Sequence, residues 1–196
     1  KTANKNNKSG NHNMKRITTS LLLGSSLLAT LPSHAGEWLQ WHGESLTYLY
    51  GKDYKIDSPI QQTVTFEHAD AWKYGDNFFF LDKIFYNGDK DALVGDNTYY
   101  GEFQPRLSLG KISGADLSFG PIKDVLISAT YERGEGRNRN YLLGPAVDLA
   151  IPGFDRFSLN TYYRKPDGIT GKPGGQWQIT PTWAMTFPVG KSDVLF

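Results

Sequence analysis

The amino-acid sequence predicts an all-β fold, an antiparallel transmembrane β-barrel of the outer-membrane type, with about eight or nine strands within 196 residues. Three observations predict it. Apolar and polar residues alternate along successive segments, the connections alternate between short and long, and the N-terminal region has the pattern of an export signal. Since successive side chains of a strand point to opposite faces, this alternation gives each strand one apolar and one polar face.

The N-terminal region divides into two parts. Residues 1–13 precede Met14 and look like translated upstream sequence or a tag. From Met14, a basic start, an apolar run and small residues up to Ala35 form the pattern of a cleavable signal peptide. A membrane-anchoring helix is the alternative, but the apolar run is shorter than the roughly 20 residues that span a bilayer. We therefore expect a signal peptide at 14–35 and part of an outer-membrane barrel at 36–196.

The strands are predicted from period-2 alternation between clusters of Gly, Pro, Asn and Asp. Several segments have the 9 to 11 residues of a tilted membrane strand, and "DVLF" at 193–196 is the start of a ninth strand. The eight predicted strands are 45–51, 61–69, 77–86, 99–109, 124–132, 140–151, 156–164 and 176–187.

The alternation has the same sense in most of these segments. In "NYLLGPAVDLAI" at 140–151, large apolar residues occupy every second position from Tyr141, and small or polar residues occupy the others. The same pattern recurs in 124–132, 156–164 and 176–187. A soluble secreted β-sandwich or a lipocalin-like barrel would show the same period, with the apolar row as its core.

Two features favour a membrane barrel over a soluble domain. Tyr and Trp lie near the ends of the apolar rows, where aromatic girdles meet lipid headgroups. Charged residues lie in the polar rows, and they are tolerated in a wet interior but costly in a dry core. Three prolines within predicted strands, Pro105, Pro145 and Pro181, count against a regular ladder and mark either bulges or strand starts.

The connections show a second regularity, because every second one is short. The segments 152–155 and 188–192 are short, whereas 87–98 and 165–175 are longer and hydrophilic. Outer-membrane barrels have short turns on the periplasmic side and longer loops outside. The long segment 110–123 breaks this rule.

Composition argues against other functions. The formal net charge of +1 gives no bulk attraction to nucleic acid, and the absence of cysteine excludes thiolate metal sites. His42 and His68 lack a second His or Glu at ligand spacing, so neither a metal nor another cofactor is expected. The "RGEGRNRN" segment at 133–140 has no phosphate-binding motif, and no nucleophile–base pair is evident. We expect no catalytic residues and no enzymatic activity.

The polar rows supply the candidate solute-contacting residues. If Asp82 faces water, Phe78 and Phe80 face the interior with it; the alternative is that this strand has the opposite sense and both rings face lipid. Rings beside carboxylates and guanidinium groups suit a planar, uncharged solute that carries hydroxyl groups. The predicted pore-lining residues are Phe78, Phe80, Asp82, Glu102, Arg106, Asp148, Tyr162 and Arg164.

The segment "EFQPRLSLGKISGADLSFGPIKD" at 102–124 resembles the Tsx family of nucleoside-specific channels, and its OmpK branch in particular. The motifs "WLQWHGES", "TVTFEHADAWKYGDNFFFLD" and "QITPTWAMTFP" add to the resemblance to OmpK, which runs from about Trp38 to the end. It implies an outer-membrane barrel larger than the strands present here, so that the chain is truncated at its C-terminus. It also implies a Gram-negative source, nucleosides as solutes, and surface loops used as a phage receptor.

The leading hypothesis is therefore a passive, porin-like outer-membrane channel for small solutes such as nucleosides, which is monomeric, contacts outer-membrane lipid and also serves as a phage receptor. One alternative is a structural or recognition protein of the outer membrane without a selective pore. Another is a soluble periplasmic ligand-binding β-barrel.

Overall fold

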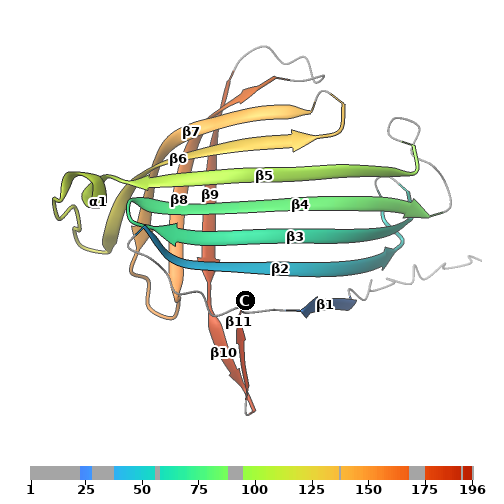
Figure 1. Cartoon of the computed structure of the whole chain (residues 1–196), viewed down its shortest axis with the longest axis horizontal. Helices are drawn as coiled ribbons and strands as arrows, with labels where there is room; N and C mark the ends of the chain where they lie inside the picture. Colours follow the sequence, from blue (N-terminus) through green and yellow to red (C-terminus); the bar gives the residue numbers. More distant parts are fainter. Residues whose placement is uncertain are drawn as a thin grey trace, which may run out of the picture.

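The computed structural model of the chain describes residues 23–27, 38–55, 58–87, 95–136, 138–167, 175–190 and 192–195 (Figure 1). Strands dominate these residues, and one short helix interrupts them. The strands are β1 (Leu23–Leu27), β2 (Leu39–Lys52), β3 (Ile60–Trp72), β4 (Gly75–Asn87), β5 (Asn97–Ser108), β6 (Ile122–Gly134), β7 (Arg139–Leu149), β8 (Arg156–Pro166), β9 (Gln176–Ala184), β10 (Thr186–Val189) and β11 (Ser192–Leu195). The helix α1 (Leu109–Ser113) follows β5.

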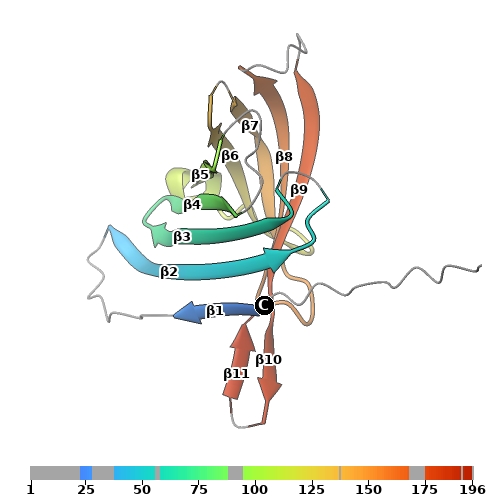
Figure 2. The same cartoon turned by 90° about the vertical axis from the view of Figure 1, so that its right-hand side faces the viewer.

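The strands β1 to β9 form one antiparallel sheet in which sequence neighbours are spatial neighbours. All eight strands predicted from alternation are present, as β2 to β9, and the all-β prediction is confirmed. Figures 1 and 2 show that the strand direction turns strongly along the sheet, since β2 to β5 run across Figure 1 whereas β8 and β9 run up it. The right-handed twist of each strand accumulates in this way.

The two faces of the sheet differ sharply in polarity. We call the face that carries Arg106 the inner face and the opposite one the outer face. Polar side chains are buried on the inner face, whereas large apolar side chains are exposed on the outer face. Buried inner-face residues include Ser108, Ser128, Glu132, Ser158 and Asn160, and exposed outer-face residues include Leu46, Phe66, Leu81, Ile127, Leu143 and Ile179. The inner face also buries Leu126, Leu142 and Ala146. A soluble core would have the reverse arrangement of exposed and buried rows, so these faces agree with the predicted orientation of apolar rows outward and polar rows inward.

Aromatic side chains gather at the ends of the outer face. At the end where β3 turns into β4, Tyr74 contacts both Trp38 and Trp72 with ring centroids 5.9 and 5.8 Å apart. At the other end, the ring centroids of Tyr131 and Tyr141 are 5.3 Å apart. These rings lie at the strand ends, where a membrane barrel carries its aromatic girdles. Among the described residues, no helix has the length and apolarity needed to cross a bilayer.

The prolines mark neither bulges nor strand starts. Pro105 lies opposite Asn77 and Pro145 lies opposite Ile127, both within continuous registers. On the other side of each strand, the ladder skips the proline and its preceding residue and then resumes in the same register. A missing backbone donor therefore interrupts pairing locally without shifting it.

Two predictions about the C-terminal part are wrong in detail. The segment 176–187 is not one strand, because it breaks at Met185 between β9 and β10. The 188–192 connection does not lead to a ninth sheet strand, because β10 and β11 pair only with each other in the described structure. Figure 1 shows this hairpin extending away from the main sheet.

The N-terminal predictions fall mostly outside the described residues. Strand β1 lies within the predicted signal peptide at 14–35 and pairs with β2, with Leu23 opposite Tyr50. The rest of that segment and residues 1–13 are not described. The signal peptide stays a prediction.

Candidate solute path

Strand register places every predicted pore-lining residue on the inner face. In antiparallel strands, directly opposite residues share a face. Phe78 lies opposite Gln104, Phe80 opposite Glu102, and Asp82 opposite Tyr100. Outward-facing Phe78 and Phe80, the alternative considered for this strand, are therefore excluded. The pairings also place Arg106, Asp148, Tyr162 and Arg164 on this face.

Arg106 is the centre of a buried charge cluster. Its Nε and Nη2 donate to the two carboxylate oxygens of Asp76, both at 2.7 Å, and its Nη1 donates to Asp148 Oδ1 at 2.8 Å. Ser158 Oγ also donates to Asp148, at 2.6 Å. Arg106 is only 6% exposed, and a charge so far removed from water is stable only with such partners. Three strands, β4, β5 and β7, are joined by this one guanidinium group.

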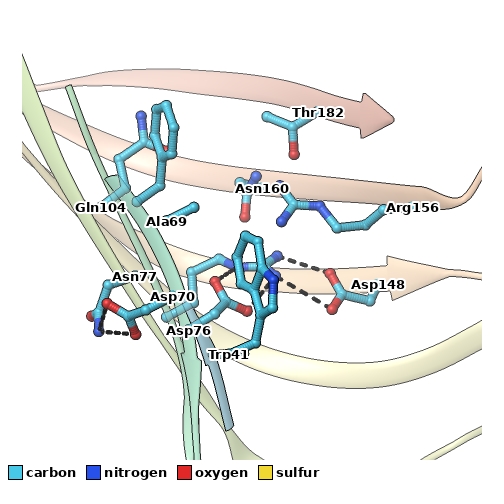
Figure 3. A pocket seen from close by; sticks show the side chains of 13 residues that line it. Trp41, Ala69, Asp70, Asp76, Asn77, Gln104, Asp148, Arg156, Asn160 and Thr182 are labelled. Carbon is cyan, nitrogen blue, oxygen red and sulfur yellow. Dashed lines mark hydrogen bonds and ion pairs between the residues drawn. The ribbon is translucent and has the colours of Figure 1, made fainter. Parts of the chain in front are cut away.

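A cavity of about 560 Å³ lies beside this cluster. Figure 3 shows Asp76, Asp148, Arg156 and Asn160 around it, with Trp41 from β2 reaching across. Strands at both ends of the sequence contribute to its wall, because the sheet curves. Neither Asp76 nor Arg156 was among the predicted site residues, although each shares strand parity with residues that were. Both lie at strand ends, where the alternation pattern is hardest to follow.

An aromatic ladder runs along the same wall. The Phe78 and Phe80 rings have centroids 6.1 Å apart, and the Phe80 and Tyr100 rings have centroids 5.9 Å apart. The Tyr100 hydroxyl donates to Glu102 at 2.7 Å, and Gln104 Nε2 donates to the other oxygen of that carboxylate at 2.6 Å. Flat apolar surfaces and hydrogen-bonding groups therefore lie side by side on β4 and β5.

A second charge cluster lies farther towards the β6–β7 loop. Glu132 accepts a hydrogen bond from Asn140 Nδ2 at 2.7 Å and forms an ion pair with Arg164. The Arg164 Nε is buried without a hydrogen-bond partner among the described residues. The sequence placed Arg164 on the inner face but did not indicate Glu132 as its partner.

Tyr162 lies flat against the wall rather than projecting from it. Its hydroxyl and Ser128 Oγ are 2.7 Å apart, and both residues are buried. Gly144 lies between them, and a Cβ there would be 1.9 Å from the carbonyl oxygen of Thr161. The missing side chain allows the ring to cross β7, as aromatic residues often do over strand glycines. The Tyr162 side chain therefore links β8 to β6 across β7 on the inner face.

Polar residues also cluster on the outer face, which the sequence did not predict. His42 Nδ1 and His68 Nδ1 lie 3.1 and 2.9 Å from the same oxygen of Glu44, and His68 Nε2 lies 3.1 Å from Asp70. The contact between Glu44 and His68 forms because β2 and β3 pair these residues, so spacing along the sequence does not show it. The described residues contain no group of three such side chains arranged to hold a metal ion.

Comparison with known proteins gives a family match that covers strands β2 to β10. The sequence model of the family described as "Nucleoside-specific channel-forming protein, Tsx" matches residues 37–191. The outer membrane protein OmpK of Vibrio parahaemolyticus is 30% identical over 94 residues, which cover 47% of this chain and 35% of the relative. The nucleoside-specific channel-forming protein Tsx of Salmonella typhimurium is 28% identical over 166 residues, covering 74% of this chain and 56% of the relative.

The chain thus spans about half the length, or less, of these curated relatives. No solved structure matches it.

Proposed function

The chain belongs to the Tsx family of nucleoside-specific channel-forming proteins and is located in the outer membrane, and from this premise we propose that its inner face lines a passive channel for nucleosides or solutes of similar size. The observation that carries the proposal is the aromatic ladder of Phe78, Phe80 and Tyr100 beside Glu102 and Gln104. A base stacks on such rings, and sugar hydroxyls donate to such carboxylates.

The charges of the inner face favour an uncharged solute. Carboxylates outnumber guanidinium groups there, and the most buried guanidinium, that of Arg106, is already held by Asp76 and Asp148. A phosphate group would meet repulsion along this wall and find few free cations. The inner-face carboxylates are Glu67, Asp76, Asp82, Glu102, Asp124, Glu132 and Asp148, against Arg106, Arg156 and Arg164.

Passage through such a channel requires no chemical step. Weak stacking and hydrogen bonding at successive positions raise the occupancy of a narrow passage and still allow the solute to leave. The ladder provides stacking positions on β4 and β5, and the two charge clusters provide hydrogen-bonding groups on either side of it.

Replacing Phe78 or Phe80 by alanine is expected to weaken the block of ion current by adenosine. Stacking of a base on an aromatic side chain contributes about 1–3 kcal/mol, so each substitution should raise the half-blocking concentration roughly 5-fold or more. The measurement is single-channel conductance of the protein in planar bilayers, titrated with adenosine.

Phe79→Ala is the matched control, because Phe79 lies between the two rings on the same strand but faces outward, opposite Phe103. Its adenosine block should equal that of the unmodified protein. An unmodified channel whose current does not respond to adenosine at all would end the nucleoside proposal.

We also propose that the loops at the end of the sheet opposite the β3–β4 turn serve as a phage receptor. These loops connect β2 to β3, β4 to β5, β6 to β7 and β8 to β9, so they gather at one end of the sheet. Replacing residues 167–175 by a short Gly-Ser turn should abolish adsorption of a phage that uses this protein and leave adenosine block intact. Adsorption that survives replacement of each of the four loops in turn would contradict this role.

A further inference from the structure

The long connection between β5 and β6, residues 109–121, is an ordered element with exposed apolar side chains. Phe119, just before β6, is 81% exposed, more than the outward-facing Trp177 at 73%. Ile112 and Leu117 in the same connection are also exposed. We call residues 109–121 the β5–β6 excursion. Exposed apolar side chains gathered on one connection mark a candidate interaction site.

Hydrogen bonds hold the excursion in one conformation. Ser108 Oγ caps α1 by accepting from the backbone of Lys111 at 3.0 Å, and Gly114 ends the helix with a positive φ of 73°. At the tip, the backbone N–H groups of Phe119 and Ile122 each donate to the other residue's carbonyl oxygen, at 3.0 and 2.9 Å. The Phe119 ring is therefore presented from a tight turn.

The excursion lies at the end of the sheet that carries the Trp38, Trp72 and Tyr74 girdle. Ser108 N donates to the carbonyl oxygen of Tyr74 at 2.8 Å, which places the end of β5 level with the β3–β4 turn. The returning chain is tied to the next turn along the sheet, because Ala150 N donates to the Pro121 carbonyl oxygen at 2.7 Å. Figure 1 shows α1 just beyond the strand ends at this side.

The girdle at this end has a gap that the excursion occupies. Trp38 just before β2, Trp72 at the end of β3 and Tyr74 in the β3–β4 turn form one part of it. Strands β8 and β9 contribute Phe157 and Trp183, whose ring centroids are 6.4 Å apart. Between them, the outward positions nearest the end of β5, β6 and β7 are aliphatic in the described structure. These positions are Leu107, Ile122, Val125, Val147 and Leu149. Phe119 is the highly exposed aromatic ring next to this gap, whereas Phe154 in the β7–β8 turn packs against Phe157 with ring centroids 5.2 Å apart.

The charges of the excursion suit a phospholipid surface. Lys111 near its start and Lys123, just after it in β6, are exposed and can reach lipid phosphates. Asp116 lies between them, and hydrogen bonds from the side chain and the backbone of Ser118 lower the pKa of its carboxyl group. It therefore stays ionised and favours the water side of the headgroups.

We propose that the β5–β6 excursion is a membrane-interface anchor whose Phe119 ring inserts among the phospholipid headgroups and upper acyl chains of the periplasmic leaflet and completes the aromatic girdle. The periplasmic side follows from the family's location in the outer membrane and from the short β3–β4 and β7–β8 turns at this end. Such an anchor would act whether or not nucleosides pass through the channel. An anchoring role accounts for a long connection on the side where barrels usually have short turns.

The test uses single cysteines, because the chain contains no cysteine of its own. Phe119→Cys is labelled with an environment-sensitive fluorophore and the protein is refolded into phosphatidylethanolamine and phosphatidylglycerol vesicles. Nitroxide-bearing phospholipids then quench the label either near the headgroup or near the end of the acyl chain. The expected result is strong quenching by the shallow nitroxide and weaker quenching by the deep one.

Two matched positions calibrate the depth. Leu143→Cys, on the outer face in the middle of β7 and 59% exposed, should be quenched best by the deep nitroxide. Pro152→Cys, in the exposed β7–β8 turn at the same end as the excursion, should be quenched by neither. Quenching at position 119 no stronger than at 152 would overturn the proposal and indicate that the tip faces the periplasm or a soluble partner. Because Phe119 is exposed, its replacement leaves the sheet intact, and heat-dependent gel migration verifies the fold of each variant.

Discussion

Gly144→Ala is expected to destabilise the protein by more than about 3 kcal/mol, beyond the usual cost of overpacking a core. The new methyl group would be 1.9 Å from the carbonyl oxygen of Thr161 and 3.2 Å from the Cα of Tyr162. Both neighbours are backbone atoms of β8, so relief requires β7 and β8 to separate. Separation would also break the contact between Tyr162 and Ser128. Urea-induced unfolding of the protein refolded into vesicles measures the loss.

Gly43→Ala is the control for this experiment. Gly43 is also a strand glycine of the inner face, but the nearest atom to its added methyl group, at 3.1 Å, belongs to the Trp41 ring. That ring is 55% exposed and can rotate away. The unfolding free energy should therefore change by less than about 1 kcal/mol. Equal losses for the two variants would show that close approach of β7 and β8 at Gly144 does not limit stability.

The second large effect is expected from Arg106→Ala. Removing the guanidinium group leaves Asp76 and Asp148 facing each other without a cation, in a wall where each side chain is only about one quarter exposed. Breaking a buried ion pair from one side costs about 3–5 kcal/mol, and the partial exposure of both carboxylates favours the lower value. Arg106→Lys should lose less, because it keeps the charge but not the two-pronged contact with Asp76.

Comparison with an exposed pair isolates the effect of burial. Arg139 and Asp167 form an ion pair at 2.7 Å with side chains 43% and 49% exposed. Arg139→Ala should change the unfolding free energy by no more than about 1 kcal/mol. Adding Asp76→Asn and Asp148→Asn to Arg106→Ala should recover part of the lost stability, because the unpaired charges are then removed. If the triple variant were no more stable than Arg106→Ala alone, loss of packing rather than unpaired charge would be the cause.

The predictions about faces succeeded because alternation is a property of each strand alone. Once Asp148 is on the polar row of 140–151, its whole strand is oriented, and the described structure agrees for every predicted inner-face residue. The strand 77–86 was ambiguous, because Phe78, Phe80 and Asp82 share one row and the opposite row is also apolar in part. The pairing of Phe80 with Glu102 resolves it.

Partners across the sheet could not be predicted in the same way. Arg106 binds Asp76 and Asp148, which are 30 and 42 residues away in sequence. Sequence reasoning selected Arg106 and Asp148 as separate pore-lining residues and omitted Asp76. Likewise, Tyr162 was expected to line the pore, but the gap at Gly144 and the hydroxyl of Ser128 hold its ring against the wall.

By itself, then, the sequence determined that the chain forms strands and which side of each strand is apolar, because side-chain direction repeats every two residues whatever the neighbours are. The tertiary structure decided which residues meet, where 176–187 breaks, and how Phe119 is presented at the strand ends. These features depend on register between strands, which is set by hydrogen bonds and turns far apart in the chain.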